Sequence, residues 1–420
     1  MAKPRLHRIV GKAELVSTEE ALMQAAIECF AARGFAATSI QDIATEAGIS
    51  KGIIYHYFAS KDEIMRRIVN RALDDLGRSY DDIPLVYASV HQQIRAFMQT
   101  MVTYVAAHPR ETAIFVQERR LFTSSFEDLA ARSDQVVMQL EDLLRNGTLD
   151  GSIRELASPH AMSLGLIGMA TWLYQWTAQT PYTPDQIADT YADVVLEGLC
   201  IDRSSQPATQ TTLPYTHDDN DWQDNGSPAR QATPTRETLT RAAIQEFVSR
   251  GYAGTPINVI AKNAGVTTGA VYSQFSGKKA ILHLIMSRFL NRLSRTMDRA
   301  LIERLPLPDV TARFISAIFG EVGDHQAEMT IFLQEFRHLA SEEFKDLRMK
   351  CNDIIAKIGA VLAAGIEEKQ FRDNVIPDVT AIGVLGMCTF PFQWKAPAEV
   401  LPPETATMFA EVILAGLAPS

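Results

Sequence analysis

The fold is decided by a stretch that occurs twice: residues 38–64, TSIQDIATEAGISKGIIYHYFASKDEI, and residues 255–281, TPINVIAKNAGVTTGAVYSQFSGKKAI. A shift of 217 positions aligns the two stretches without a gap, and the alignment extends over 25–65 and 242–282. Such self-similarity indicates a duplicated structural unit and is examined before any other pattern.

The duplication covers the whole protein. The same shift relates residues 108–120 to 325–337, and after a one-residue insertion a shift of 218 relates 165–176 to 383–394. Residues 202–230 lie between the two halves and are polar, acidic and Pro-bearing, which predicts a flexible linker. Its expected reach is about 25 to 30 Å, so the two halves can pack side by side.

Each repeat carries the start and stop signals of short helices. Ser17 with Glu20 predicts a capping box that opens a first helix, and Gly34 predicts its end. Thr38 is expected to cap a second helix, Ile40 to Ala47, and in the repeat Thr255-Pro256 places proline at the first helical position.

A glycine turn follows, at Gly48 or Gly265, and a third short helix is expected to start at Ser50 or Thr267. This helix is predicted to end within Tyr55–Phe58 or Tyr272–Phe275. Two short helices joined by a glycine turn, with Ala44 and Ala261 where they cross, predict a helix-turn-helix in each half.

Both copies resemble the DNA-binding domain of the TetR family of transcriptional regulators, including the Y-x-x-F-x-x-K ending of the motif. The resemblance implies an all-α fold of two tandem units, each a three-helix DNA-binding domain followed by an α-helical regulatory and dimerisation domain. The units are expected to form a pseudo-dimer within one chain. The expected boundaries are a basic arm 1–13, DNA-binding domain 14–67, regulatory domain 68–201, linker 202–230, DNA-binding domain 231–284 and regulatory domain 285–420.

The second helix of a helix-turn-helix places its first residues at base edges, while flanking residues hold phosphates. On this basis the expected DNA contacts are Thr38, Ser50, Lys51, Gly52, Ile53, Tyr55, His56, Tyr57 and Lys61 in copy one, and Thr255, Thr267, Thr268, Gly269, Ala270, Tyr272, Ser273, Gln274 and Lys278 in copy two. Lys51 is suited to donate hydrogen bonds to O6 and N7 of guanine. Thr38 and Thr255 are expected at a helix N-terminus beside a phosphate, and by resemblance Lys61 and Lys278 also grip the DNA backbone. Tyr57 and Gln274 stand where the family usually has His, which alters that phosphate contact.

The local charge of the two copies favours DNA binding to different extents. The net charge of the chain is −10, yet residues 228–292 hold nine Lys or Arg against two acidic residues, and residues 1–70 hold nine against eight. Copy two should therefore have more non-specific affinity for DNA. In the arm, Lys3, Arg5, Arg8 and Lys12 either follow the minor groove or form a solvated tail.

The two predicted DNA-reading surfaces differ, notably at Lys51/Thr268 and His56/Ser273. Identical subunits bind palindromes because the operator mirrors the symmetry of the protein. Two different surfaces predict a non-palindromic operator. The alternative is that copy two has lost base recognition and only grips the backbone.

In the family the last two helices of each unit form a four-helix bundle, which here corresponds to 164–176, 184–199, 382–394 and 402–417. The candidate effector-contacting residues are Phe115, Gln117, Met138, Trp172, Tyr174 and Trp176 in copy one, and Phe332, Gln334, Phe390, Phe392 and Trp394 in copy two. Each of them is also explained as ordinary core. The recurring Gln117-Glu118 and Arg120 indicate a polar anchor or an ion pair. By resemblance the effector is a hydrophobic or amphipathic molecule, such as an acyl-CoA or a lipid product, that releases the operator.

Other classes of protein lack support in the sequence. No hydrolase, metalloprotease, phosphate-loop or dinucleotide-binding motif is present, so neither an enzyme nor a cofactor is expected. Four scattered cysteines indicate no disulfide framework or zinc site and favour a bacterial cytoplasmic, nucleoid-associated protein. The charge-free segment 156–184 suits a buried interfacial helix better than a membrane span. The remaining alternative is a constitutive, architectural DNA-binding protein without a ligand response.

Overall fold

The computed structural model describes residues 12–81, 88–176, 180–199, 234–302, 305–394 and 404–419. Within these ranges all regular structure is helical, so the predicted all-α class is confirmed. The linker and the basic residues Lys3, Arg5 and Arg8 of the arm lie outside the described residues.

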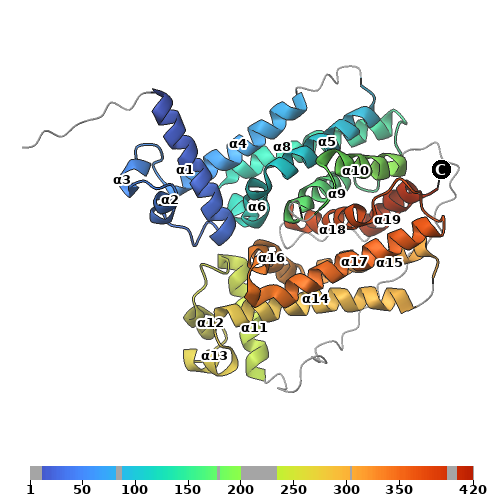
Figure 1. The fold of residues 1–420 in the computed structure, drawn as a ribbon. Coiled ribbons are helices and arrows are strands. Elements are labelled where there is room, and N and C mark those ends of the chain that lie inside the picture. Colours follow the sequence, from blue (N-terminus) through green and yellow to red (C-terminus); the bar gives the residue numbers. More distant parts are fainter. Residues whose placement is uncertain are drawn as a thin grey trace, which may run out of the picture.

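The N-terminal half begins with the predicted helix-turn-helix and continues as a helical regulatory domain (Figure 1). Its helices are α1 (Lys12–Arg33), α2 (Ile40–Glu46), α3 (Lys51–Ile54), α4 (Lys61–Asp81), α5 (Val90–Ala107), α6 (Pro109–Gln117), α7 (Arg119–Ser124), α8 (Glu127–Leu149), α9 (Pro159–Thr171), the 3-10 turn η1 (Trp172–Gln175) and α10 (Pro184–Leu199).

The C-terminal half repeats this order. Its helices are α11 (Pro234–Arg250), α12 (Ile257–Asn263), α13 (Thr268–Gln274), α14 (Lys278–Ile302), α15 (Leu307–Asp324), α16 (Gln326–Gln334), the 3-10 turns η2 (Phe336–Ala340) and η3 (Glu342–Phe344), α17 (Lys345–Glu367), α18 (Pro377–Trp394) and α19 (Glu404–Leu417). In this half the place of α7 is taken by the two 3-10 turns.

The helix-turn-helix of the first half follows from a capping box and a glycine. Ser39 Oγ accepts a hydrogen bond from the N–H of Asp42, and the Asp42 carboxylate accepts one from the N–H of Ser39. Gly48 then adopts a φ of 68°, which glycine adopts without strain. Ala44 is fully buried at the crossing of the short helices, so the two helices pack closely.

Four predicted helix boundaries or caps were wrong. The first helix starts at Lys12, so Ser17 lies inside it rather than at its cap. Ser39, not Thr38, caps α2, and Pro256 occupies the cap position of α12 rather than its first turn. The third helix of the first half ends at Ile54 because the chain turns at the next residues.

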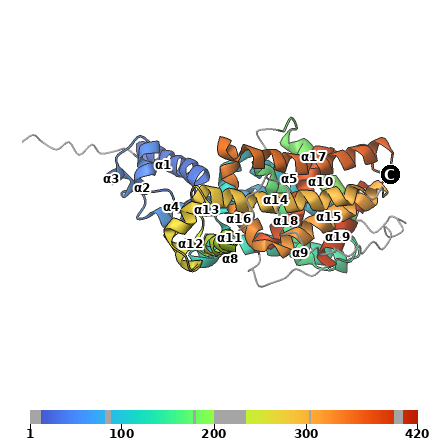
Figure 2. The same ribbon diagram turned by 90° about the horizontal axis from the view of Figure 1, so that it is seen from below.

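The two halves pack against each other through the helices that the family resemblance indicated. α9 lies along α18 and α10 along α19, so one chain forms the bundle that two subunits would otherwise share. Both helix-turn-helix domains project from the same end of the molecule, and the C-terminus lies at the other end (Figures 1 and 2). This arrangement allows both to face one DNA duplex.

Glycines permit the close approach of these helices. A Cβ on Gly168 would overlap the carbonyl oxygen of Gly386, and a Cβ on Gly386 would overlap that of Gly168. Gly198 and Gly416 are placed in the same way against Val412 and Val194 of the opposite half. The two crossings therefore exclude side chains larger than hydrogen at four positions.

The charge-free segment of the first half forms α9, whose residues from Ala161 to Thr171 are all buried. It packs in the interface between the halves, as expected. In the described part of the chain, no helix is both long and apolar enough to cross a membrane.

Candidate DNA-binding surface and effector cavities

The N-terminal helix-turn-helix, called head 1 (residues 12–60), exposes the first turn of α3. Lys51, Gly52 and His56 are exposed, and the side chains of Ile53 and Tyr55 are 37% and 52% exposed. Ser50 caps α3 in an extended conformation without a side-chain capping bond. A lysine, an apolar residue and an aromatic residue exposed side by side offer a donor and apolar contacts that suit the major groove of DNA.

The C-terminal helix-turn-helix, called head 2 (residues 234–277), exposes a chemically different surface. Thr268, Gly269 and Ser273 are exposed, and Tyr272 is 57% exposed. The hydroxyl of Thr267 is used as a cap, since it accepts a hydrogen bond of 3.2 Å from the N–H of Ala270. Head 2 therefore has threonine and serine where head 1 has lysine and histidine.

Three predicted DNA contacts at the edge of these surfaces are only partly exposed. Tyr57 packs against the core of head 1, and Ala270 and Gln274 are partly buried in head 2. The carbonyl of Gln274 accepts a hydrogen bond of 2.8 Å from Arg236, whose guanidinium lies over the ring of Phe275. The backbone at this corner is thus held in place from α11.

The predicted phosphate contacts of Thr38 and Thr255 were wrong. Thr38 is 2% exposed and Thr255 is fully buried. The Thr38 hydroxyl donates to the carbonyls of Gly34 (2.8 Å) and Cys29 (3.1 Å), and the Thr255 hydroxyl donates to the equivalent pair in head 2. Both threonines hold the turn after the first helix, so no hydroxyl remains for DNA.

Lys61 and Lys278 bind backbone carbonyls of their own heads. Lys61 Nζ donates to the carbonyls of Phe35 (2.7 Å) and Thr38 (2.8 Å) and lies over the ring of Phe35. Lys278 Nζ donates in the same way to Tyr252 (2.8 Å). Burial lowers the pKa of both lysines. Both fasten the long helix α4 or α14 to the preceding turn, and their phosphate contacts stay predictions.

The regulatory domain of the first half encloses a mostly apolar cavity, called the N-terminal cavity, with an empty volume of about 660 Å³. Its walls come from α4, α5, α6, α8 and α9, and Phe115 of α6 is part of them. Trp394 of the other half completes the wall. The indole Nε1 of Trp394 donates to Asp134 (2.8 Å), and its ring lies 3.7 Å from the guanidinium of Arg119.

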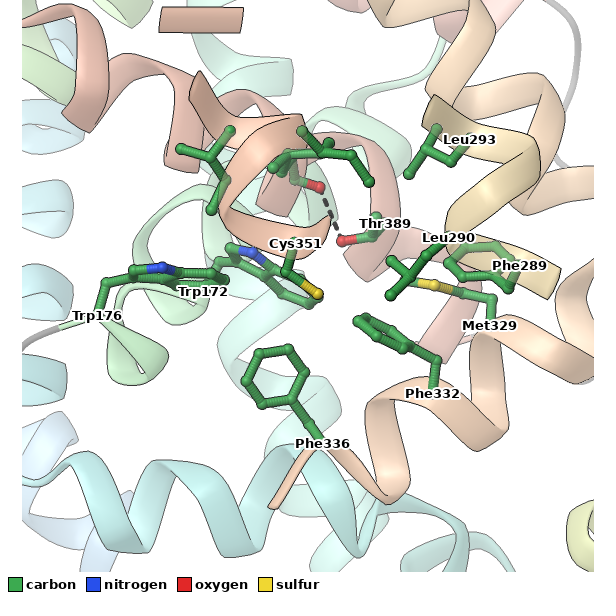
Figure 3. Close-up of a pocket in the computed structure, with 13 residues that line it drawn as sticks. Trp172, Trp176, Phe289, Leu290, Leu293, Met329, Phe332, Phe336, Cys351 and Thr389 are labelled. Carbon is green, nitrogen blue, oxygen red and sulfur yellow. Dashed lines mark hydrogen bonds between the residues drawn. The ribbon is translucent and has the colours of Figure 1, made fainter. Parts of the chain in front are cut away.

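The corresponding cavity of the second half, called the C-terminal cavity, has an empty volume of about 400 Å³. Figure 3 shows Phe332, Met329 and Phe289 on one side of it, and Trp172 and Trp176 of the first half on the other. The hydroxyl of Thr389 donates to the carbonyl of Leu385 (2.7 Å), so it offers no donor to a ligand.

Comparison with known proteins now identifies the architecture. The family described as bacterial regulatory proteins, tetR family, matches residues 22–68 and 239–285. The tetracyclin repressor-like C-terminal domain matches residues 87–199 and 310–417. The chain belongs to the TetR family. The two matches of each domain confirm the tandem duplication.

Individual TetR relatives each match less than half of the chain. The HTH-type transcriptional repressor KstR2 of Mycobacterium tuberculosis is 28% identical over 198 residues, which is 46% of this chain and 98% of that protein. KstR2 of Rhodococcus jostii is 29% identical over 186 residues, 42% of this chain and 89% of that protein. One unit of this chain thus corresponds to a whole relative.

Two solved structures of transcriptional regulators are also similar to this chain. KstR2 of M. tuberculosis covers 46% of this chain and 99% of its own, at 27% identity and a TM-score of 0.41. AibR, solved with isovaleryl coenzyme A and operator DNA, covers 42% of this chain and 96% of its own, at 25% identity and a TM-score of 0.38.

Three tryptophans of the described residues line the cavity of the opposite half. Trp172 and Trp176 line the cavity of the second half, and Trp394 lines that of the first. The cause is that the ends of α9 and α18 lie in the interface between the halves, so their aromatic residues extend into the partner domain.

The other predicted effector contacts lie outside the walls of these two cavities. Met138 is 58% exposed on the outer face of α8, which corrects its assignment. Gln117 is buried and donates to the hydroxyl of Tyr174 (3.4 Å). Phe390 packs on Trp394, and Phe392 packs on Phe319 of α15. Gln334 uses its carbonyl to accept a hydrogen bond from Arg337.

Arg120 and its equivalent Arg337 connect each half to the head of the other. Arg337 donates to the carbonyl of Phe30 at the end of α1 (2.8 Å) and pairs with Glu118 of the first half (2.8 Å). Arg120, its equivalent, donates to the carbonyl of Ser249 near the end of α11. The signal was the recurrence of Glu-x-Arg in both halves, and of the two interpretations left open the ion pair is present, between halves.

Proposed function

We propose that the protein is a TetR-family transcriptional repressor that reads a non-palindromic operator with two different heads held in one chain. The observation that supports this most strongly is the exposed surface of the third helix and of the residues that follow it, which carries Lys51 and His56 in head 1 but Thr268 and Ser273 in head 2. The single-chain bundle fixes both heads at one end of the molecule. Head 1 has a lysine that can bind guanine, and head 2 has none at the equivalent position. The two heads are therefore expected to bind unlike half-sites.

The proposed DNA contacts are the exposed residues of α3 and α13 and their flanks. Thr38 and Thr255 act indirectly, by holding the turns. The protein would act on chromosomal DNA in the cytoplasm, and a small molecule bound in a regulatory cavity would release it. The apolar cavities support a hydrophobic or amphipathic effector. The relative AibR was solved with an acyl-coenzyme A and operator DNA, so an acyl-CoA or another lipid-derived molecule is the first class to examine.

The test is selection of bound duplexes from a random DNA pool at about 150 mM salt, where non-specific electrostatic binding is weak. We expect two unlike half-sites at a fixed spacing. Lys51→Ala should relax the preference at one half-site only, by about 1–3 kcal/mol for the lost base contact. A palindrome would refute the single-chain reader, because two chains would then present the same head. No enrichment would favour an architectural protein.

A further inference from the structure

The two cavities occupy equivalent places, because their walls correspond at the repeat shifts of 217 and, after the insertion, 218. Three of the wall positions that differ change the size or polarity of the side chain most. Ala72, Thr112 and Ser133 of the N-terminal cavity correspond to Phe289, Met329 and Cys351 of the C-terminal one. Each change replaces a small side chain by a larger or more apolar one, and the empty volume falls from about 660 to about 400 Å³.

The cavities also differ in the polar partners they offer. The N-terminal wall includes Glu111, whose carboxylate lies 3.6 Å from the ring of His108, and Tyr104. The C-terminal wall has the hydroxyl of Thr389, which is already bonded, the thiol of Cys351, and the indole N–H donors of Trp172 and Trp176, but it contains no carboxylate. A ligand whose polar end donates a hydrogen bond would therefore find a carboxylate acceptor in the N-terminal wall only.

The wall of the N-terminal cavity is mechanically connected to both heads. Glu111, Thr112 and Phe115 line it from α6. At the end of the same helix, Glu118 accepts a hydrogen bond of 3.0 Å from the N–H of Phe35 in head 1. Arg120, in the helix that follows directly, donates to Ser249 in head 2. A displacement of α6 by a ligand therefore acts on both contacts at once.

Building on the proposed function, we propose that one effector binds per chain, in the N-terminal cavity, and that α6 transmits its binding to both heads. The effector is an amphipathic molecule with an apolar body and an O–H or N–H donor at its polar end. The donor bonds to Glu111, and a carboxylate at the same position is repelled by it. The C-terminal cavity is part of the core and takes no effector.

Isothermal titration calorimetry of the full chain without DNA tests the site, with 1-decanol, decylamine and decanoate as probes of equal chain length. We expect decanol and decylamine to bind with a stoichiometry of one, and decanoate to bind about 10- to 100-fold more weakly, the range of a hydrogen bond to a charged group. Glu111→Gln should remove most of this difference. Two molecules per chain, tightest binding of decanoate or absence of binding for all three probes would overturn the proposal.

Paired variants identify the cavity. Ala72→Phe and Thr112→Met, which introduce the residues of the C-terminal half, should each weaken decanol binding at least tenfold, while Phe289→Ala leaves the affinity unchanged. Thermal unfolding checks that each variant folds, and two independent filling variants guard against the failure of one. Unchanged binding in both filling variants, or loss of binding in Phe289→Ala, would refute the assignment.

The connection to the heads is measured by hydrogen exchange with and without decanol. Amides of residues 34–38 and 249–255 should both exchange faster in the bound protein. A change confined to one head would refute transmission to both. Because these measurements need no operator, a failure of the DNA selection would count against the proposed function alone.

Discussion

At the scale of single residues, Lys61 and Lys51 of head 1 and its flank have different roles. Lys61 donates to two backbone carbonyls of the turn after α1, at 2.7 and 2.8 Å. Lys61→Met would leave both carbonyls without their donor in a half-buried site. We expect the free energy of unfolding to fall by about 1–3 kcal/mol, measured by urea denaturation followed by circular dichroism.

The matched control is Lys51→Ala, because Lys51 is exposed on α3. It should leave the urea midpoint unchanged and weaken DNA binding only. Equal stability of the Lys61 variant and the wild type, together with a reduced salt dependence of DNA binding, would instead identify Lys61 as a direct phosphate contact.

Sequence reasoning located the residues of α3 and α13 that the structure exposes, yet it did not predict that Thr38 and Lys61 bind backbone carbonyls. The reason is chemical. A hydroxyl and an ammonium donate equally well to a phosphate oxygen and to a backbone carbonyl, and the choice depends on which acceptor the fold brings within 3 Å. The turn after α1 supplies such carbonyls to both side chains. The motif fixes the residue type but leaves its acceptor open.

At the scale of helices, the crossing of α9 and α18 depends on the absence of a side chain at Gly168. Gly168→Ala would place a Cβ against the backbone of Gly386, forcing the helices apart at a cost of about 1–3 kcal/mol. Gly77→Ala in α4 is the control, since a Cβ there meets nothing within 4 Å. It should stabilise the protein by about 0.5–1 kcal/mol. Thermal unfolding of both variants measures the contrast, and destabilisation by both or by neither would contradict the packing.

Arg120 and Arg337 each contact the head of the opposite half. These contacts predict that each half stabilises the end of the first helix of the opposite head. Arg337→Ala removes the donor to Phe30 O and the partner of Glu118. We expect amides at the end of α1 to exchange with solvent about tenfold faster or more, the equivalent of one lost charged hydrogen bond. Arg120→Ala should have the same effect at the end of α11. Faster exchange in the head of the substituted half, rather than in the opposite head, would contradict the crossing.

The helices of the heads and the interface could be predicted from the sequence, because caps, glycines and the repeat all indicate the same elements. The contacts that side chains of one half make in the opposite half could not be predicted. A repeat shows that 165–176 and 383–394 are equivalent, but equivalence does not tell whether Trp176 enters its own domain or the opposite one. That depends on how α9 and α18 cross, which no local pattern encodes.

At the scale of the whole molecule, the tandem arrangement removes the symmetry of a dimer. Two separate subunits of one gene must be identical, whereas two fused units are free to diverge at the heads and in the cavities. The halves differ on the exposed surfaces of α3 and α13 and in the cavity walls, among other positions, while the glycines of the interface are kept in both halves. Divergence of the recognition surfaces on a retained scaffold is the pattern expected of a single-chain reader of unlike half-sites.

The final prediction makes the heads alike. A chain carrying Thr267→Ser, Thr268→Lys, Ala270→Ile, Ser273→His and Gln274→Tyr presents the α3 surface of head 1 on both heads. Since the scaffold that sets their spacing is unchanged, selection from a random pool should now yield a palindrome of the head 1 half-site at the original spacing. The reverse exchange, with Ser50→Thr, Lys51→Thr, Ile53→Ala, His56→Ser and Tyr57→Gln, should yield a palindrome of the other half-site. An operator unchanged by either exchange would mean that α3 and α13 do not read the bases. If only the first exchange gave a palindrome and the second abolished enrichment, then head 2 grips the DNA backbone without reading sequence.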